Sequence, residues 1–224
     1  MIFVFYFFAV VLVFLSCKSF RGGIEYLNFF KRELAKLPSD FAPFVSIVAP
    51  CRGLDEDLEE NLSALFRQQF PRYEVIFVVD DSEDESVPII NKLISKHLSI
   101  SSKLVIAPDA VETSQKVENL REAILHVSHE SKVFVFVDSD ARPPENWLRN
   151  LIAPLTDEKI GAATGYRWFI SKKFSFASEM RSVWNASIAS ALGANLKSNF
   201  CWGGSMAMRR EIFEKLEIRE KWRG

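Results

Sequence analysis

Cysteine and histidine are scarce in this sequence, with three of each among 224 residues. The cysteines at 17, 51 and 201 are widely separated and form no CxxC pair, which disfavours both a disulfide framework and a zinc site. His126 and His129 have no third ligand near them in the sequence, so a histidine metal site is not predicted either. The lack of paired cysteines is typical of a domain in a reducing compartment.

Excess charge of either sign is also lacking. The 28 basic and 29 acidic residues give a formal net charge of -1, and such a balance produces no long-range field that gathers nucleic acid. Nucleic acid is therefore not a predicted partner. Gly203-Gly204-Ser205 does not fit the GxxxxGK(S/T) pattern, and neither GxGxxG nor GxSxG occurs where it would be needed. Kinase, dinucleotide-binding and serine hydrolase functions are disfavoured for this reason.

The first segment has no charge before Lys18, and residues 2–17 are apolar almost throughout. The apolar run at 2–17 is slightly shorter than the roughly 20 residues that cross a bilayer, and it predicts a transmembrane anchor over residues 1–20. A cleaved signal peptide, or a lipoprotein signal using Cys17, is an alternative that the missing basic start disfavours. The positive-inside rule puts the following domain on the cytosolic side, because several basic residues come next: Lys18, Arg21, Lys31, Arg32 and Lys36.

Residues 21–43 are predicted to form a juxtamembrane helix, over about 24–37, and a linker containing Pro38 and Pro43. From residue 44 to 224, short β-rich runs alternate with stretches of helical period, which predicts an α/β domain with a mostly parallel sheet. The predicted strands are Phe44–Ala49, Glu74–Val79, Lys103–Ala107, Val133–Val137 and Ala162–Trp168. The predicted helices are Asp57–Gln68, Val87–His97, Val117–His126 and Glu145–Leu151.

Polar residues follow these strands, where ligands of open parallel sheets bind. Asp138 and Asp140 come directly after the run at 133–137. Carboxylate oxygens suit Mn2+ or Mg2+, whose remaining positions are filled by water and substrate phosphates. Acidic residues after a strand also serve as turn formers or helix N-caps, and this alternative stays open.

A second acidic pair, Asp80 and Asp81, follows the strand at 74–79. In the functional interpretation Asp81 accepts the imide hydrogen of a uracil ring, while main chain at Pro50 and Cys51 borders the base. Two basic residues after the first and third strands would face a pyrophosphate, although each could equally be a surface cation: Arg52 and Lys116.

Five segments occur in a characteristic order: Pro50 to Asp55, Tyr73 to Asp81, Lys116 to Leu120, Val137 to Asp140, and Gly203 to Arg210. In this order and spacing they resemble family 2 glycosyltransferases with the GT-A fold, most closely the ceramide glucosyltransferase branch and its bacterial relatives. The resemblance covers roughly residues 45–210. It implies an inverting transfer of a hexose from a UDP-sugar to a membrane lipid acceptor, dependent on Mn2+ or Mg2+.

The resemblance also implies roles for individual residues. Asp81, beside Asp80, would bind the nucleotide, Asp138 and Asp140 would bind the metal with the donor diphosphate, and Lys116 would lie near the nucleotide. Further contacts to the nucleotide sugar are expected from the remaining motif positions, Pro50, Cys51, Arg52 and Gly204.

Two family motifs, a third aspartate that acts as general base and a (Q/R)xxRW sequence, are not found before Gly224. We therefore expect the general base beyond this residue, in a longer protein. Alternatives are a membrane-tethered nucleotide-binding domain without transferase activity, a transferase with a polysaccharide acceptor, and a plain structural domain. The segment from Phe174 to Leu192 is apolar at helical spacing, which fits a helix packed on the sheet as well as one that touches lipid.

Overall fold

The computed structural model describes residues 2–35, 40–166, 171, 174–192, 195 and 199–223. The chain divides into two compact units, one formed by residues 1–37 and 168–200 and the other by residues 38–167 and 201–224. The second unit, which we call the sheet unit, contains residues 44–167 and 201–224 of the predicted α/β domain, whereas residues 168–200 group with the first unit.

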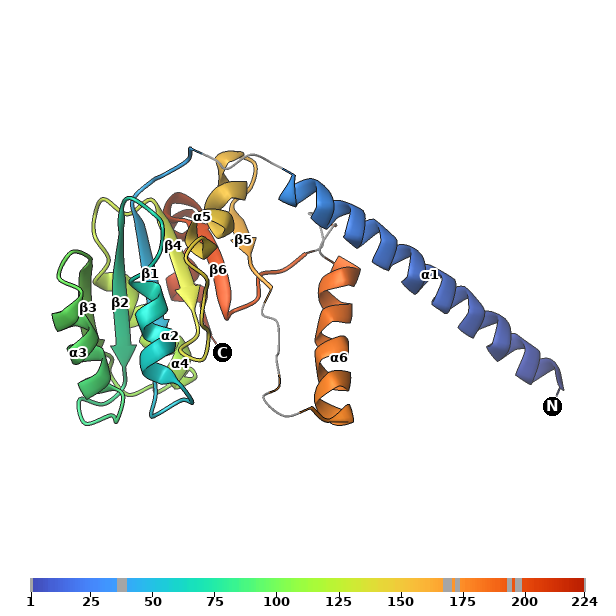
Figure 1. The fold of residues 1–224 in the computed structure, drawn as a ribbon, viewed down its shortest axis with the longest axis horizontal. Helices are drawn as coiled ribbons and strands as arrows, with labels where there is room; N and C mark the ends of the chain where they lie inside the picture. Colours follow the sequence, from blue (N-terminus) through green and yellow to red (C-terminus); the bar gives the residue numbers. More distant parts are fainter. Residues whose placement is uncertain are drawn as a thin grey trace. The chain divides into compact units, whose positions relative to one another are not determined.

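Among its described residues, the sheet unit contains one six-stranded sheet with the order β3-β2-β1-β4-β6-β5 (Figure 1). The first four strands in the chain are parallel to one another, and β6 is antiparallel to both β4 and β5. The predicted mostly parallel sheet is confirmed. The strands are β1 (Val45–Pro50), β2 (Tyr73–Val79), β3 (Ser101–Ile106), β4 (Val133–Val137), β5 (Ala162–Thr164) and β6 (Ser205–Arg209).

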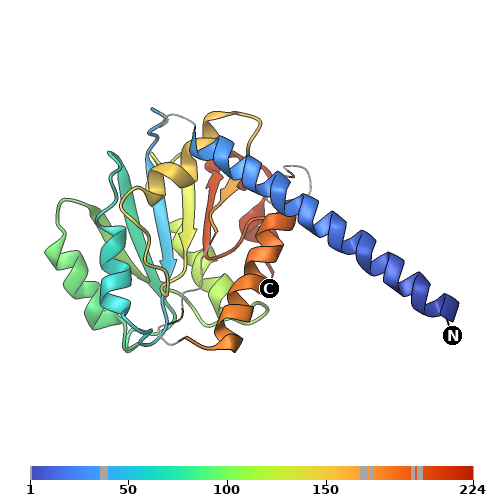
Figure 2. The same cartoon turned by 45° about the vertical axis from the view of Figure 1, so that its right-hand side comes forward.

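Helices cover both faces of this sheet (Figure 2). Successive side chains of a strand point to opposite faces of the sheet. Strands β1, β2 and β4 therefore contribute residues to two separate hydrophobic clusters, one on each face. Val135 packs with residues of α2, α3 and α5 on one face, whereas Phe134 and Phe136 pack with α4 and α7 on the other. The helices of the sheet unit are α2 (Leu58–Leu65), α3 (Val87–Lys96), α4 (Gln115–Leu125), α5 (Trp147–Ile152), the 3-10 helix η1 (Ala153–Thr156), α7 (Arg210–Lys215) and α8 (Ile218–Lys221).

Strand β6 is the main element that the sequence pattern does not predict. It lies between β4 and β5, so the predicted fifth strand pairs with β6 rather than with β4. Its residues, Ser205-Met206-Ala207-Met208-Arg209, are few and contain no β-branched or aromatic side chain, so they lack the usual signal of a strand. The predicted fifth strand is also shorter than expected: β5 ends at Thr164, and residues 167 and 168 lie outside the described residues.

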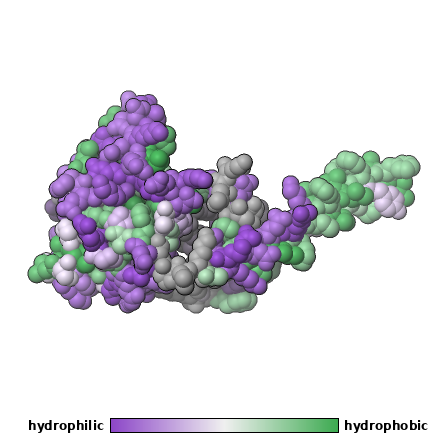
Figure 3. All heavy atoms as spheres, turned by 90° about the horizontal axis from the view of Figure 1, so that it is seen from above, coloured by the Kyte–Doolittle hydropathy of each residue, from purple (hydrophilic) through white to green (hydrophobic). Residues whose placement is uncertain are grey.

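The other unit contains α1 (Ile2–Leu34) and α6 (Phe176–Leu192), which contact each other. The apolar anchor continues into the predicted juxtamembrane helix as one helix, which ends at Leu34, and an ion pair between Arg21 and Glu25 at 3.1 Å supports it beyond the apolar stretch. Residues 36 and 37 of that prediction lie outside the described residues. Over Ile2–Glu33 this helix is long and apolar enough to cross a membrane. Its apolar side chains are exposed, as Figure 3 shows along α1.

Candidate functional site

The order of the strands creates a topological switch point between β1 and β4. The chain passes from β1 to β2 and β3 on one side, and then returns to place β4 on the other side of β1. Ligands of open α/β sheets bind at such a point, beyond the carboxyl ends of the strands. A cavity of about 330 Å³ opens there, and it is lined by Pro50, Cys51, Arg52, Asp55, Gln115, Lys116, Asn119, Asp138, Ser139 and Asp140. We call it the switch-point cavity.

Most of the site residues predicted from the sequence line this cavity. Pro50 is the last residue of β1, and Cys51 and Arg52 follow it. Lys116 lies in the first turn of α4, and the carboxylates of Asp138 and Asp140 follow β4. These segments are far apart in the sequence. The parallel sheet and the helix after β3 bring them together.

Asp80 and Asp81 line a second cavity of about 460 Å³, which we call the acidic cavity. It shares Arg52 with the switch-point cavity and also contains Asp84 and Asp109. Asp81 therefore lies in a different, adjoining cavity from Pro50 and Cys51, although the sequence interpretation assigned all three residues to the uracil base.

Gly204 lies beside the switch-point cavity rather than among its lining residues. Because β6 runs antiparallel to β4, its first residue, Ser205, pairs with Val137. The Gly204 carbonyl then accepts a hydrogen bond of 3.4 Å from the backbone N–H of Asp138. Gly204 therefore helps to position the backbone at the first metal-ligand candidate.

Asp138 and Asp140 fit a cation that arrives with other oxygen ligands. The Asp138 side chain is 18% exposed, Asp140 is exposed, and both line the same cavity. Within the described part of the chain no group of three or more His, Cys, Asp or Glu residues could hold a metal ion by itself. Two carboxylates leave positions for water and phosphate oxygens, which is the usual arrangement for Mg2+ at substrate phosphates.

Lys116 already makes a short ion pair in this cavity. Its Nζ lies 2.6 Å from Oδ1 of Asp138. The lysine side chain is 55% exposed, so its ammonium group can reach solvent as well as the aspartate.

The loop after β1 is held in place by two carboxylates. The Ser139 hydroxyl donates to Asp55 at 2.5 Å, which links this loop to the loop after β4. Gly53, whose φ of 62° is in the left-handed region that favours glycine, donates its backbone N–H to both oxygens of Asp84 at 3.0 and 2.9 Å. Burial alone would raise the pKa of Asp84, but hydrogen bonds from Ser86 and Gly53 outweigh it and lower that pKa. Asp84 is therefore ionised and holds the loop through hydrogen bonds rather than acting as a proton donor.

Cys51 forms a closed part of the cavity wall. Its side chain is 2% exposed, and burial, together with the charges of Asp55 and Asp84, raises the pKa of its thiol to about 12. A thiol that stays protonated at neutral pH is a poor nucleophile. Cys51 therefore shapes the cavity without taking part in covalent chemistry.

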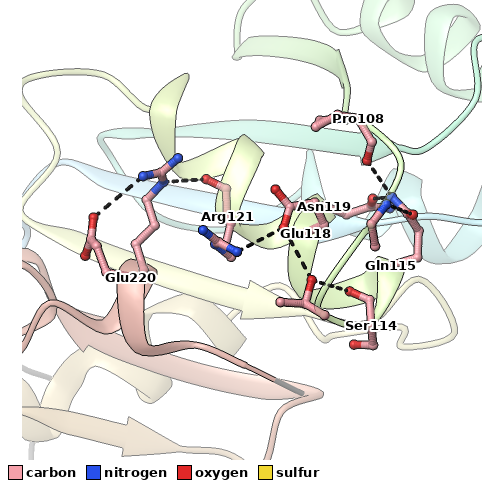
Figure 4. Close-up of polar contacts among 10 residues, drawn as sticks. Pro108, Ser114, Gln115, Glu118, Asn119, Arg121 and Glu220 are labelled. Atoms are coloured by element: carbon pink, nitrogen blue, oxygen red, sulfur yellow. Dashed lines mark hydrogen bonds and ion pairs between the residues drawn. The ribbon is translucent and has the colours of Figure 1, made fainter.

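Gln115 and Asn119 are site residues whose role the sequence reasoning did not identify. The Gln115 side-chain amide donates to the Pro108 carbonyl at 2.9 Å and to Asn119 at 2.8 Å, and its oxygen accepts from the backbone N–H of Ala110 at 2.8 Å (Figure 4). These bonds fix the loop after β3 against the start of α4. In the same view a second network joins α4 to α8, where Arg219 donates to the Arg121 carbonyl at 3.1 Å.

Comparison with known proteins identifies a family and several relatives. A family model described as glycosyl transferase family 21 matches residues 2–216. Ceramide glucosyltransferase 1 of Caenorhabditis elegans is 33% identical over 86 residues, which cover 38% of this chain and 18% of that protein. The ceramide glucosyltransferase of Candida albicans is 29% identical over 123 residues, covering 50% of this chain and 22% of the relative. The chain thus spans about a fifth of the length of these two relatives.

Solved structures share the fold at low sequence identity. A mannosyltransferase from Pyrobaculum calidifontis, in complex with GDP-Man and Mn2+, matches with a TM-score of 0.59 and 22% identity over 91% of this chain and 56% of its own. Staphylococcus aureus TarS 1–349, in complex with UDP-GlcNAc, matches with a TM-score of 0.52 and 17% identity over 78% and 48% of the two chains.

The predicted GT-A fold and the predicted likeness to ceramide glucosyltransferases are both confirmed by these matches. The family model extends over nearly the whole chain, from the apolar part of α1 to the end of α7. The protein belongs to glycosyl transferase family 21.

Proposed function

We propose that this chain supplies the donor site of an inverting hexosyltransferase, which binds a UDP-sugar with Mn2+ or Mg2+ and acts on a membrane lipid. The observation that carries the proposal is the convergence of Arg52, Lys116, Asp138 and Asp140 on one cavity at the topological switch point. Basic side chains and a carboxylate pair together are what a metal-bound diphosphate requires. A mannosyltransferase of the same fold was solved with a nucleotide sugar and Mn2+, which supports this assignment.

Charge explains why a cation is needed at this site. The two basic residues of the switch-point cavity face three acidic ones, Asp55, Asp138 and Asp140. The acidic cavity has one basic residue against four aspartates. A diphosphate would be repelled by this acidic excess unless a divalent cation lay between it and the carboxylates. The chemistry that a bound Mn2+ or Mg2+ supplies is stabilisation of the negative charge on the departing diphosphate.

Four residues of the chain would bind the cation and the diphosphate. Asp138 and Asp140 would hold the cation, and Arg52 and Lys116 would orient the phosphate oxygens in the switch-point cavity. Since Arg52 also lines the acidic cavity, a nucleotide whose phosphates lie beside it can extend its base toward Asp81.

In this proposal Asp81 recognises the base. Its side chain is exposed in the acidic cavity, and one carboxylate oxygen accepts the backbone N–H of Glu83 at 2.9 Å, which fixes the orientation of the group. An oriented carboxylate accepts a hydrogen bond from the imide N–H of uracil. Cytosine has no hydrogen at that ring nitrogen, so the site should prefer UDP to CDP.

We expect UDP to bind at least about tenfold more tightly than CDP in the presence of Mn2+, which is the low end for a hydrogen bond to a charged group. Asp81→Asn should bring the two affinities close together, because the amide of the new side chain can donate to cytosine. Competition titrations against a fluorescent uridine nucleotide would measure both ratios. Glu83→Gln is the control, since Glu83 contributes its backbone N–H and should leave the ratio unchanged. Equal binding of UDP and CDP to the unaltered chain would contradict the role of Asp81.

The lipid acceptor is supported by the unit that contains α1 and α6. The apolar stretch of α1 would cross the bilayer, and the basic residues that follow it favour a sheet unit on the cytosolic side. On α6 the large apolar side chains are strongly exposed, with Phe176 at 79% and Trp184 at 72%. Ser178, Ser182 and Asn185 are less exposed and lie on another side of the helix. Lys172 and Lys173, which precede α6, lie outside the described residues.

Contact of α6 with lipid can be tested by fluorescence quenching in vesicles that contain brominated phospholipid. The chain has five tryptophans, and Trp184 should account for a large share of the quenched signal because it lies on the exposed apolar side. Trp184→Phe should therefore lower the quenched fraction. Trp222→Phe is the matched control. Trp222 packs in the sheet unit, where its ring centroid lies 5.5 Å from that of Phe136, so its removal should not lower the quenched fraction. If both variants keep the quenched fraction of the unaltered chain, α6 does not lie on lipid.

A further inference from the structure

The carboxylate that is proposed to hold the cation already has a cationic partner from the protein. Lys116 comes from the first turn of α4 and Asp138 from the end of β4, and their charged groups are 2.6 Å apart. Asp138 is 18% exposed, whereas Lys116 is 55% exposed. The ion pair lies within the switch-point cavity, where the diphosphate and the cation would bind.

A divalent cation bound at Asp138 would compete with this ammonium group for the negative charge of the carboxylate. Two positive charges bound to the same carboxylate repel each other strongly at a distance of a few ångströms, and the repulsion is greater where water is partly excluded. Binding of the cation alone therefore weakens the ion pair, at a point when no diphosphate is present to take up the ammonium group.

The lysine can leave without a change in the fold. Its flexible stem is more than half exposed, and Gln115 anchors the start of α4 to Pro108 and Ala110. A diphosphate in the same cavity would offer the ammonium group a new anionic partner. The movement would then be confined to one side chain.

We propose that Lys116 holds Asp138 in the empty site and transfers to the diphosphate when the donor binds, so that it couples cation binding to nucleotide binding. The inference rests on the proposed function and assigns Lys116 a positioning role in it. Thermodynamic linkage makes this coupling reciprocal: if UDP strengthens Mn2+ binding by some factor, Mn2+ strengthens UDP binding by the same factor.

The test measures Mn2+ alone, by the electron paramagnetic resonance signal of the free ion, with the full chain in detergent. Lys116→Met removes the ion pair, so Mn2+ without nucleotide should bind roughly three- to thirtyfold more tightly. The lower figure corresponds to the free energy of an exposed ion pair, and the upper figure to that of a hydrogen bond to a charged group. Adding UDP should strengthen Mn2+ binding by a smaller factor than in the unaltered chain. Lys116→Arg, which keeps the charge, should behave like the unaltered chain.

Arg52→Met is the control for general electrostatics, because it removes another positive charge from the same cavity. It should tighten the binding of Mn2+ alone less than Lys116→Met does. Unchanged or weaker Mn2+ binding in Lys116→Met would overturn the inference, and so would equal tightening in the two methionine variants. Binding of UDP to the unaltered chain with Mn2+, while the variants show no difference in Mn2+ affinity, would support the donor site and contradict the role of Lys116. If UDP does not bind at all, both the proposed function and the inference that rests on it are contradicted.

Discussion

Asp138→Asn is expected to abolish Mn2+-dependent binding of UDP. The substitution keeps the size of the side chain but removes the negative charge from a position that is only 18% exposed. Loss of a group that merely orients a metal ligand costs 10- to 100-fold in metal affinity, so loss of a ligand itself should weaken UDP binding by roughly 100-fold or more. Calorimetric titration of UDP in the presence of Mn2+ measures the change.

Glu158→Gln is the matched control for Asp138→Asn. Glu158 is an exposed acidic residue of the sheet unit that follows η1 and lines neither cavity. Its neutralisation removes the same charge from the chain and should leave UDP affinity within about twofold, as for a surface substitution. Circular dichroism would check that both variants are folded. Wild-type affinity in Asp138→Asn would exclude the carboxylate as a cation ligand.

Glu74→Ala is expected to cause the largest loss of stability. Glu74 is 2% exposed in β2 and accepts hydrogen bonds of 2.6 Å from the Ser46 hydroxyl and from the backbone N–H of Ser128, with the ammonium group of Lys103 at 3.9 Å. Removing the carboxylate leaves one buried donor, the Ser46 hydroxyl, and one partly buried donor, the Ser128 N–H, without this acceptor. Removal of one member of a buried charged network costs about 3–5 kcal/mol. For a domain of this size the midpoint of thermal unfolding should fall by roughly 10 °C.

Glu130→Ala separates this effect from the loss of a surface ion pair. Glu130 lies two residues after Ser128 and pairs with Arg72 at 2.7 Å, but both side chains are more than half exposed. Its removal should cost about 1 kcal/mol or less. Glu74 is remote from the cavity linings, so at low temperature folded Glu74→Ala should bind UDP normally. Equal shifts of the unfolding midpoint in the two variants would show that Glu74 is not a structural anchor.

The parallel part of the sheet is predictable from the sequence because three of its four strands, β1, β2 and β4, are buried on both faces. Such strands read as unbroken apolar runs, and the observed bounds of β1 to β4 differ from the predicted ones by at most two residues. Val133–Val137 agrees at both ends. Strand β6 is only five residues long and pairs antiparallel after a long excursion of the chain. Its place between β4 and β5 depends on tertiary contacts that no local pattern records.

The charged residues of the site are predictable because strand ends converge in a parallel sheet. This rule predicts from the sequence alone that Asp138, Asp140 and Arg52 lie close together. The bracing of the loops is not predictable in the same way. The bond from Gly53 to Asp84 joins residues 31 apart in the sequence and requires a left-handed glycine. The pairing of Lys116 with Asp138 depends on where α4 begins, and it begins two residues before the predicted start.

The most direct test of the donor site is calorimetric titration of UDP into the full chain, first with Mn2+ and then with an excess of chelator. We expect saturable binding with Mn2+ that is lost when the chelator removes the cation. If the folded chain binds no UDP, or binds it equally well with and without the cation, the cavity between β1 and β4 is not a metal-dependent nucleotide-sugar site.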